Sequence, residues 1–182
     1  MDQISAVLRR AMPFQMVSDK TLGDIAKLAK WRSHARGDMI YDWGDGADDI
    51  YIVASGSVQH LLKTQTDSAE IEKIMRGGDV FGWAAVLEGQ RRRLAKTVCL
   101  ERTELIQING QELMELIKQS PTTGDVIMSR FATMITKEFS APASVAARIP
   151  HFDASGASGK PVAQQGDGVG SGWALTAFRL EQ

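Results

Sequence analysis

Six short runs rich in β-branched and aromatic residues follow one another between Met39 and Ile108. Gly, Asp and Ser separate the runs, which is typical of short strands joined by tight turns. The runs are Met39–Tyr41, Ile50–Ala54, Ser57–Lys63, Glu70–Met75, Leu94–Leu100 and Glu104–Ile108. Short strands at such intervals predict an antiparallel barrel or roll, so we expect a mainly β, jelly-roll-like fold.

Two short helices are predicted before the strands. Apolar residues recur there at helical spacing. The two sets are Ile4, Val7 and Leu8, and then Leu22, Ile25, Leu28 and Ala29. Ser18 and Asp19 precede the second set and have side chains that are preferred at a helix N-terminus.

A pair of helices is predicted after the strands. Asn109 is the expected cap of the first, with Glu112 three residues later, and Pro121 and Gly124 are expected to break it. The last helix is predicted from about Thr122 to Phe139. Its apolar stripe either packs on the roll or builds a homodimer. The stripe consists of Ile127, Phe131, Met134 and Ile135.

The composition excludes several classes of protein. The chain has 182 residues, a formal net charge of -1 and 43% hydrophobic residues, which is typical of an ordinary folded domain and not of a nucleic-acid-binding one. No apolar run has the length of a signal-peptide core or a membrane span, so we expect a cytoplasmic protein with no membrane attachment. The single cysteine, Cys99, implies neither a disulfide nor a metal site.

The sequence shows no catalytic or metal-binding pattern. His34, His60 and His151 lie far apart without neighbouring nucleophiles or metal ligands, and we interpret them as surface or turn residues. The acidic run Asp42–Asp49 lacks the terminal glutamate and the spacing of a calcium-binding loop. We therefore predict that the chain is not an enzyme and has no metal or cofactor.

The composition changes abruptly after Ser140, where Ala, Ser, Gly, Pro and Gln dominate. We predict one domain over residues 1–140 and a flexible tail over residues 141–182. The end of the tail, Trp173–Leu180, is either a short docking peptide or part of a disordered terminus. Because such a tail has no basic recognition helix, direct binding to nucleic acid is not expected.

The segment Gly77–Ala95 combines three features that suit a phosphate group. Gly82 allows a tight turn and a close approach of the backbone to a ligand. A short apolar helix begins directly after it, and the N–H groups at a helix start favour an anion. Arg91–Arg93 follow, and a guanidinium group matches two phosphate oxygens. Because side chains alternate along a strand, Arg91 and Arg93 are expected to point into a pocket above the small Ala95, and Arg92 to point out.

These residues resemble the phosphate-binding cassette of the cyclic nucleotide-binding domain family, whose usual form is Phe-Gly-Glu, a short apolar helix and Arg-x-Ala. Phe81–Gly82 and Arg93–Ala95 match this form, and Arg36–Ile40 and Asp49–Val58 look like the family's glycine-punctuated early strands. The resemblance covers about residues 10 to 139. It implies a β-roll with N-terminal helices and a C-terminal helix pair. It also implies that the last helix closes over the ligand and relays binding to an effector protein.

The resemblance supplies the candidate site. Trp83 stands where the family's glutamate accepts a hydrogen bond from the ribose 2′-hydroxyl, and its indole only donates. Leu94 stands where many members carry Ser or Thr. A tryptophan variant of the cassette occurs among bacterial members, so Trp83 indicates a subgroup. The predicted ligand-binding residues are Phe81, Gly82, Trp83, Ala84, Ala85, Arg93, Leu94 and Ala95. From the last helix, Met128, Arg130 and Thr133 are the candidates for contacts with the base.

Two functions follow from these features. In the first, the domain is a regulatory sensor that binds the phosphate of cyclic AMP, cyclic GMP or a related phosphorylated molecule. It then signals through the Thr122–Phe139 helix to an effector protein or to a second copy of itself. In the second, Trp83 fills the pocket, and the domain is a protein-protein interaction or dimerisation module that binds no nucleotide.

Overall fold

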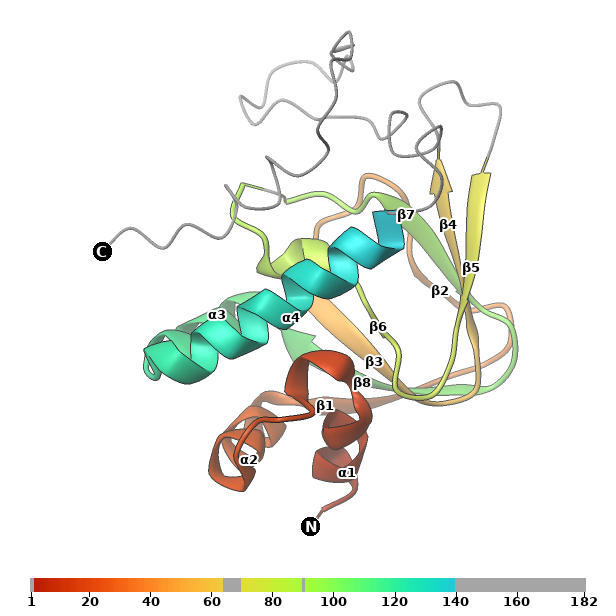
Figure 1. The fold of residues 1–182 in the computed structure, drawn as a ribbon. Helices are drawn as coiled ribbons and strands as arrows, with labels where there is room; N and C mark the ends of the chain where they lie inside the picture. The colour runs from red at the N-terminus through yellow and green to blue at the C-terminus, as the bar shows by residue number, and fades with distance from the viewer. Residues whose placement is uncertain (1, 64–69, 90, 140–182) are drawn as a thin grey trace, which may run out of the picture.

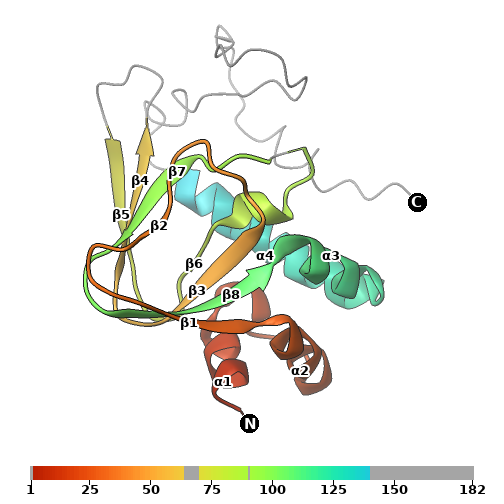
Figure 2. The same ribbon diagram turned by 180° about the vertical axis from the view of Figure 1, so that it is seen from behind.

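The computed structural model describes residues 2–63, 70–89 and 91–139. The described residues form two antiparallel sheets of four strands, ordered β1-β8-β3-β6 and β2-β7-β4-β5, with helices along one side of the roll (Figures 1 and 2). The strands are β1 (Lys30–His34), β2 (Met39–Tyr41), β3 (Asp49–Ser55), β4 (Val58–Lys63), β5 (Glu70–Met75), β6 (Val80–Phe81), β7 (Ala95–Cys99) and β8 (Thr103–Asn109). The prediction of a mainly β antiparallel roll with flanking helices is confirmed.

Two of these strands were not predicted from the sequence. Strand β1 is exposed along most of its length and has no alternation of apolar and polar residues. Pairing with β8 holds it in place, and Glu104 of β8 accepts hydrogen bonds from Trp31 Nε1 at 2.6 Å and from Ser33 Oγ at 2.5 Å. Strand β6 has only two residues and pairs with β3 directly before Gly82.

The helices flank the strands, and two of them begin at the predicted caps. The helices are α1 (Gln3–Arg10), η1 (Met12–Phe14), α2 (Asp19–Leu28), η2 (Trp83–Val86), α3 (Gly110–Lys118) and α4 (Pro121–Phe139), of which η1 and η2 are 3₁₀ turns and α2 and α3 begin at the predicted caps. The Ser18 side chain accepts a hydrogen bond from the Thr21 N–H at 3.2 Å, and Asn109 accepts one from the Glu112 N–H at 3.1 Å. Both caps satisfy an amide that the helix itself leaves unpaired.

The junction between α3 and α4 differs from the prediction in one respect. Helix α3 ends at Lys118, and Pro121 opens α4, where its missing N–H costs nothing. Gly124 does not break a helix, because it lies inside the first turn of α4. A Cβ atom at Gly124 would lie 2.7 Å from the carbonyl oxygen of Ile117, so this glycine allows α4 to cross close to the end of α3.

The apolar stripe of α4 packs inside the chain. Ile127 and Phe131 are fully buried, and the Phe131 ring meets Phe14 of η1 edge-on, with ring centres 6.1 Å apart. These side chains are taken up by contacts within the chain, as the interpretation that the stripe packs on the domain predicts. Helix α4 packs against η1 and α3, and it is drawn in front of the roll in Figure 1.

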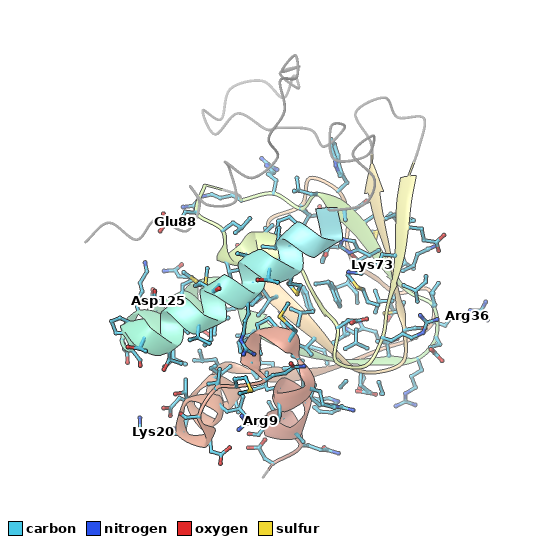
Figure 3. All side chains as sticks on the ribbon, viewed as in Figure 1. Arg9, Lys20, Arg36, Lys73, Glu88 and Asp125 are labelled. Atoms are coloured by element: carbon cyan, nitrogen blue, oxygen red, sulfur yellow. The ribbon has the colours of Figure 1, made fainter. Side chains whose placement is uncertain are left out.

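Buried residues form two clusters. The helix-side cluster lies between the helices and the faces of β3 and β8 that they cover. Its largest fully buried members are Leu8, Phe14, Leu22, Ile25, Ile50, Ile52, Ile106, Ile108 and Phe131. The roll cluster lies between the two sheets and consists of Tyr41, Tyr51, Val53, Val58, Met75, Phe81, Cys99 and Leu105. Charged side chains such as Lys20, Arg36 and Asp125 project outward from both clusters (Figure 3).

The predicted tail, residues 141–182, lies outside the described residues, as do Trp173–Leu180 and His151. Within the described ranges, no helix combines the length and the apolar character that crossing a bilayer requires.

Candidate ligand-binding site

One pocket opens beside the roll cluster, and we refer to it as the roll pocket. It encloses about 270 Å³ of space, its open mouth included. Its walls come from β2, β4, the Gly82 turn, η2 and the start of β7. The lining residues are Tyr41, His60, Gly82, Trp83, Ala84, Arg93, Leu94 and Ala95. Because this figure includes the open space at the mouth, the enclosed part is well below the roughly 300–1,000 Å³ that is usual for small-ligand pockets, so a nucleotide requires the pocket to widen.

Gly82 forms the tight turn that the sequence predicts. Its φ angle is +78°, in the left-handed region that favours glycine. A Cβ atom would lie 2.9 Å both from Arg93 Nη1 and from the Asp49 carbonyl oxygen. Gly82 therefore provides both the backbone conformation and the space that the arginine occupies. The helix after it is a single 3₁₀ turn, Trp83–Val86, whose first amides have no acceptor within the turn.

Arg93 is a buried residue of the pocket wall. The residue is only 3% exposed. Its Nη1 donates to the Gly82 carbonyl oxygen at 3.0 Å and its Nη2 to the Asp49 carbonyl oxygen at 2.9 Å. The third nitrogen, Nε, is buried and has no hydrogen-bond partner among the described residues. The guanidinium is thus fixed by two backbone carbonyls, and its buried Nε–H is left without a partner among the described residues.

The surroundings of Arg93 are aromatic. Its guanidinium carbon lies 4.3 Å from the centre of the Tyr41 ring and 5.8 Å from that of Tyr51, both within range of a cation–π contact. Burial raises the pKa of the Tyr51 hydroxyl, which therefore stays protonated. No carboxylate of a described residue forms an ion pair with Arg93.

The neighbouring arginines both point outward. Arg92 is exposed, as predicted, and its Nη1 donates to the Gly44 carbonyl oxygen at 2.9 Å. Arg91 is also exposed, so the prediction that it enters the pocket is wrong. The reason is that the chain at residues 91–93 pairs with the turn at residues 44–47, where Arg91 O accepts from Ala47 N at 3.0 Å, instead of extending β7.

Six of the eight predicted residues line the roll pocket, and two do not. Phe81 packs in the roll cluster, stacked on Tyr51 with ring centres 5.2 Å apart. The carbonyl of Ala85 lies against Gly110, the first residue of α3. Trp83 lines the pocket and is also a buried member of the helix-side cluster, with 5% of the residue exposed. Its indole therefore forms a wall between the pocket and the helices.

Two lining residues, Tyr41 and His60, were not predicted. His60 is buried on β4, so its interpretation as a surface or turn residue is wrong. Burial, with the positive charges of Lys73 and Arg93, lowers the pKa of His60 to about 4. Its Nδ1 lies 3.2 Å from Oγ1 of Thr97 on β7. The burial of His60 could have been predicted from the alternation of side chains along a strand, which places His60 on the same face as the apolar Val58.

The residues of α4 expected to contact a base lie elsewhere. Met128 packs in the helix-side cluster, and Arg130 Nη1 donates to the Met12 carbonyl oxygen at 3.2 Å. Thr133 is exposed, and its hydroxyl donates to the Ser129 carbonyl oxygen at 2.9 Å. None of the three lines the roll pocket as the structure describes it.

The acidic run forms a turn. The Asp42 N–H donates to Asp45 Oδ2 at 2.7 Å, which is the local bonding expected of turn carboxylates. In the part of the chain that the structure describes, no three His, Cys, Asp or Glu side chains gather as a metal site would require.

The chain is similar to curated proteins of known class. Residues 31–120 match the family described as cyclic nucleotide-binding domain. The chain is 31% identical over 110 residues to a candidate potassium channel protein of Rhodopseudomonas palustris. This match covers 59% of this chain and 26% of the relative. The chain is also 32% identical over 91 residues to the cyclic AMP receptor protein of Thermus thermophilus. That match covers 50% of this chain and 41% of the relative. Each match spans less than half of the relative's length.

Solved structures share the fold. The catabolite activator protein of Thermus thermophilus gives a TM-score of 0.63 at 21% identity, over 75% of this chain and 64% of that one. The regulatory domain of Toxoplasma gondii PKA, crystallised with cyclic AMP, gives 0.58 at 21% identity, over 73% of this chain and 49% of that one. Identities this low show the fold alone. Together with the family match, they confirm that the chain belongs to the cyclic nucleotide-binding domain family and has the β-roll of catabolite activator protein.

Proposed function

We propose that this domain is a regulatory, non-catalytic sensor that binds the phosphate of a cyclic nucleotide at Arg93. The observation that carries the proposal is a buried cation with an unused donor, because Arg93 is 3% exposed and its Nε has no partner among the described residues. Leaving a buried donor unpaired costs about 1–3 kcal/mol, and more when the group is charged. A phosphate oxygen supplies the missing acceptor and a compensating negative charge.

In the proposed complex, the phosphate approaches the guanidinium on the edge that the two backbone carbonyls leave open. The Gly82 and Asp49 carbonyl oxygens hold Nη1 and Nη2, so the group is oriented before the ligand arrives. The phosphate then accepts from Nε and from the amides at the start of η2. The Thermus relative is named a cyclic AMP receptor, so cyclic AMP is the first ligand to test and cyclic GMP the second.

The same contacts suggest how binding reaches α4. The Gly110 N–H at the start of α3 donates to the Asp48 carbonyl oxygen at 2.8 Å, one residue before the carbonyl that holds Arg93. A Cβ at Gly110 would lie 2.2 Å from the Ala85 carbonyl oxygen, so α3 rests directly on η2. Widening the pocket at η2 therefore displaces α3, and through the close contact of Gly124 with Ile117 it displaces α4.

Calorimetric titration with cyclic AMP and cyclic GMP tests the proposal, with Arg93→Leu and Arg92→Leu as a matched pair. Both variants remove one arginine of the same segment, but only Arg93 is buried in the pocket. We expect saturable binding by the natural chain and by Arg92→Leu, and a loss of at least about 100-fold in Arg93→Leu, because a buried charged contact is removed. Equal affinities in the two variants would overturn the proposal.

A second function is favoured by the size of the pocket. Trp83 forms one wall, and the space of about 270 Å³ includes the open mouth, so the enclosed part is small for a nucleotide. A domain with a closed pocket would act as an interaction or dimerisation module through the exposed side of α4, where Val126 is 40% exposed. Under this alternative, no cyclic nucleotide binds, and sedimentation shows a dimer whose mass falls to that of a monomer in Val126→Asp. A monomer at all concentrations would exclude a homodimer.

A further inference from the structure

Three hydrogen bonds in series connect strand β1 with Arg93. Arg32 Nε on β1 donates to Gln107 Oε1 on β8 at 2.7 Å, and Gln107 Nε2 donates to Asp49 Oδ2 on β3 at 2.7 Å. The backbone carbonyl oxygen of the same Asp49 accepts from Arg93 Nη2 at 2.9 Å. The proposed phosphate contacts involve only the last of these bonds, so Gln107 and its two bonds have no part in them.

The side chain of Gln107 matches both of its neighbours. A guanidinium only donates hydrogen bonds, and a carboxylate only accepts them. The amide oxygen of Gln107 therefore faces Arg32, and the amide N–H group faces Asp49. Thr103 and Leu105, on the same face of β8, are buried, and a polar amide on such a face costs free energy unless it is bonded. The two bonds satisfy the amide and hold the Asp49 side chain.

The Asp49 carboxylate lies near Arg93 without pairing with it. One hydrogen bond and the length of one residue separate the two charges. Both charges act on the same hydroxyl, because burial raises the pKa of Tyr51, the charge of Asp49 raises it further and that of Arg93 lowers it. Yet no carboxylate in the described part of the chain lies within ion-pair distance of Arg93. An aspartate has three staggered χ1 positions, and the bond from Gln107 favours the observed one.

An ion pair between Asp49 and Arg93 would compete with a phosphate. Carboxylates and phosphates both bind a guanidinium through charge-assisted hydrogen bonds. A carboxylate bonded to Arg93 would neutralise the charge that attracts the ligand and would occupy a donor that the ligand needs. The buried guanidinium therefore serves an anionic ligand best while the nearest carboxylate is bonded elsewhere.

We propose that Gln107 is a positioning residue for the ligand site, because it holds the Asp49 carboxylate away from Arg93 and so keeps the guanidinium available to the phosphate. Arg32 contributes by orienting the Gln107 amide. This inference rests on the proposed function, since it requires a phosphate group at Arg93. It adds to that function a residue of β8 that does not line the roll pocket.

The test measures the affinity for cyclic AMP by calorimetry in a double-mutant cycle of Gln107→Leu and Asp49→Asn. The first change frees the carboxylate, and the second removes its charge. Two controls match these changes. Gln59→Leu removes a glutamine of β4 whose Nε2 donates to Glu72 Oε1, also at 2.7 Å, and Asp48→Asn removes the neighbouring carboxylate, which is exposed. Thermal unfolding of each variant checks that it is folded.

We expect Gln107→Leu to bind cyclic AMP about tenfold more weakly than the natural chain, the size that one charge-assisted hydrogen bond carries. Adding Asp49→Asn to Gln107→Leu should restore the affinity to within about threefold of the natural chain, whereas adding Asp48→Asn should not. Because Asp49 is already held away from Arg93 in the natural chain, Asp49→Asn alone should change the affinity by less than about threefold, as should Gln59→Leu.

An unchanged affinity in Gln107→Leu would overturn the proposal. So would a double variant that stays as weak as Gln107→Leu, because the loss would then not depend on the Asp49 charge. Equal restoration by Asp48→Asn would also count against it, since any nearby negative charge would then act alike. In each case Arg93→Leu still reports on the phosphate site by itself. Absence of binding by the natural chain would overturn the proposed function, and this proposal with it.

Discussion

The two buried clusters of this domain differ in chemistry. The helix-side cluster is formed by hydrophobic side chains, among them Phe14, Ile50 and Phe131. The roll cluster instead surrounds two ionisable groups, Arg93 and His60, which are both nearly inaccessible to solvent. Burial of apolar surface stabilises a fold, whereas burial of a charge opposes folding unless a partner compensates it.

Under the proposed function, this difference separates residues that build the domain from residues that serve the ligand. The apolar stripe of α4 belongs to the first group, although the resemblance to the family suggested an interface at this helix. The cassette belongs to the second group, because Gly82 and Arg93 adopt an arrangement that the fold alone does not need. Substitutions in the first cluster should therefore change stability, and substitutions in the second should change binding.

The largest effect is expected in the helix-side cluster. Phe131→Ala removes a fully buried ring that contacts Phe14, so the free energy of unfolding should fall by about 3–5 kcal/mol. Denaturant unfolding measures it. Val126→Ala on the exposed side of the same helix is the control and should change stability by less than about 0.5 kcal/mol. A loss below about 1 kcal/mol in Phe131→Ala would mean that this cluster does not hold the helices.

The second prediction concerns pH and His60. Its charged neighbours are Lys73 from β5 and Arg93, and Tyr41 and Thr97 face it from β2 and β7. Its folded pKa of about 4 lies below its ordinary value of 6.5, so as the pH falls the unfolded chain takes up this proton first. Stability should therefore decrease between pH 6.5 and 4, and this contribution should level off below pH 4.

The contribution of His60 is at most about 3 kcal/mol, at about 1.4 kcal/mol for each pH unit. Unfolding of the natural chain and of His60→Gln, followed over the same pH range, isolates it. The variant should lose less stability on acidification. Parallel curves for the two proteins would show that His60 does not stay neutral in the fold.

The third prediction tests the contact between η2 and α3. A Cβ at Gly110 would lie 2.2 Å from the Ala85 carbonyl oxygen, whereas nothing lies within 4 Å of one at Gly23 in α2. Gly110→Ala should therefore cost about 1–3 kcal/mol by overpacking and weaken cyclic AMP binding. Gly23→Ala should stabilise the protein by up to about 1 kcal/mol and leave binding unchanged. If the two alanines have the same effect, α3 does not rest on the cassette.

The smallest effect is expected for the ribose. No carboxylate lines the roll pocket as described, and Trp83 replaces the family's glutamate. Removing the 2′-hydroxyl should thus change the affinity by less than about threefold, below the effect of one hydrogen bond. Competition between cyclic AMP and 2′-deoxy cyclic AMP measures this difference. A tenfold weaker 2′-deoxy ligand would show that another group accepts the hydroxyl proton.

Most of the fold was predictable because its strands alternate. Ala95, Thr97 and Cys99 all face the interior, as the pattern of their segment predicts. Strand β1 was not predictable, because an exposed edge strand has no such pattern, and its place is set by pairing with Glu104 and its neighbours on β8. Gly124 was misread because the sequence does not reveal that α4 crosses against Ile117.

The site was predictable only in part. Gly82 and Arg93 could be identified because a left-handed turn favours glycine and the phosphate of the proposed ligand favours a guanidinium. Arg91 was placed wrongly because its strand pairs with the turn at residues 44–47, a contact distant in sequence. His60 was not assigned to the site because its position on a strand does not show which pocket it lines. That becomes clear only from the pairing of β4 with β7, which is not visible in the sequence.

The measurement that tests the central claim most directly is denaturant unfolding of the natural chain and of Arg93→Leu, each with and without cyclic AMP. Without ligand, the two proteins should differ by no more than about 1 kcal/mol, because the variant also removes a buried charge without a carboxylate partner. Cyclic AMP at about 100 times its dissociation constant should stabilise the natural chain by about 2.7 kcal/mol and leave Arg93→Leu unchanged. Equal stabilisation of both proteins, or of neither, would contradict the account.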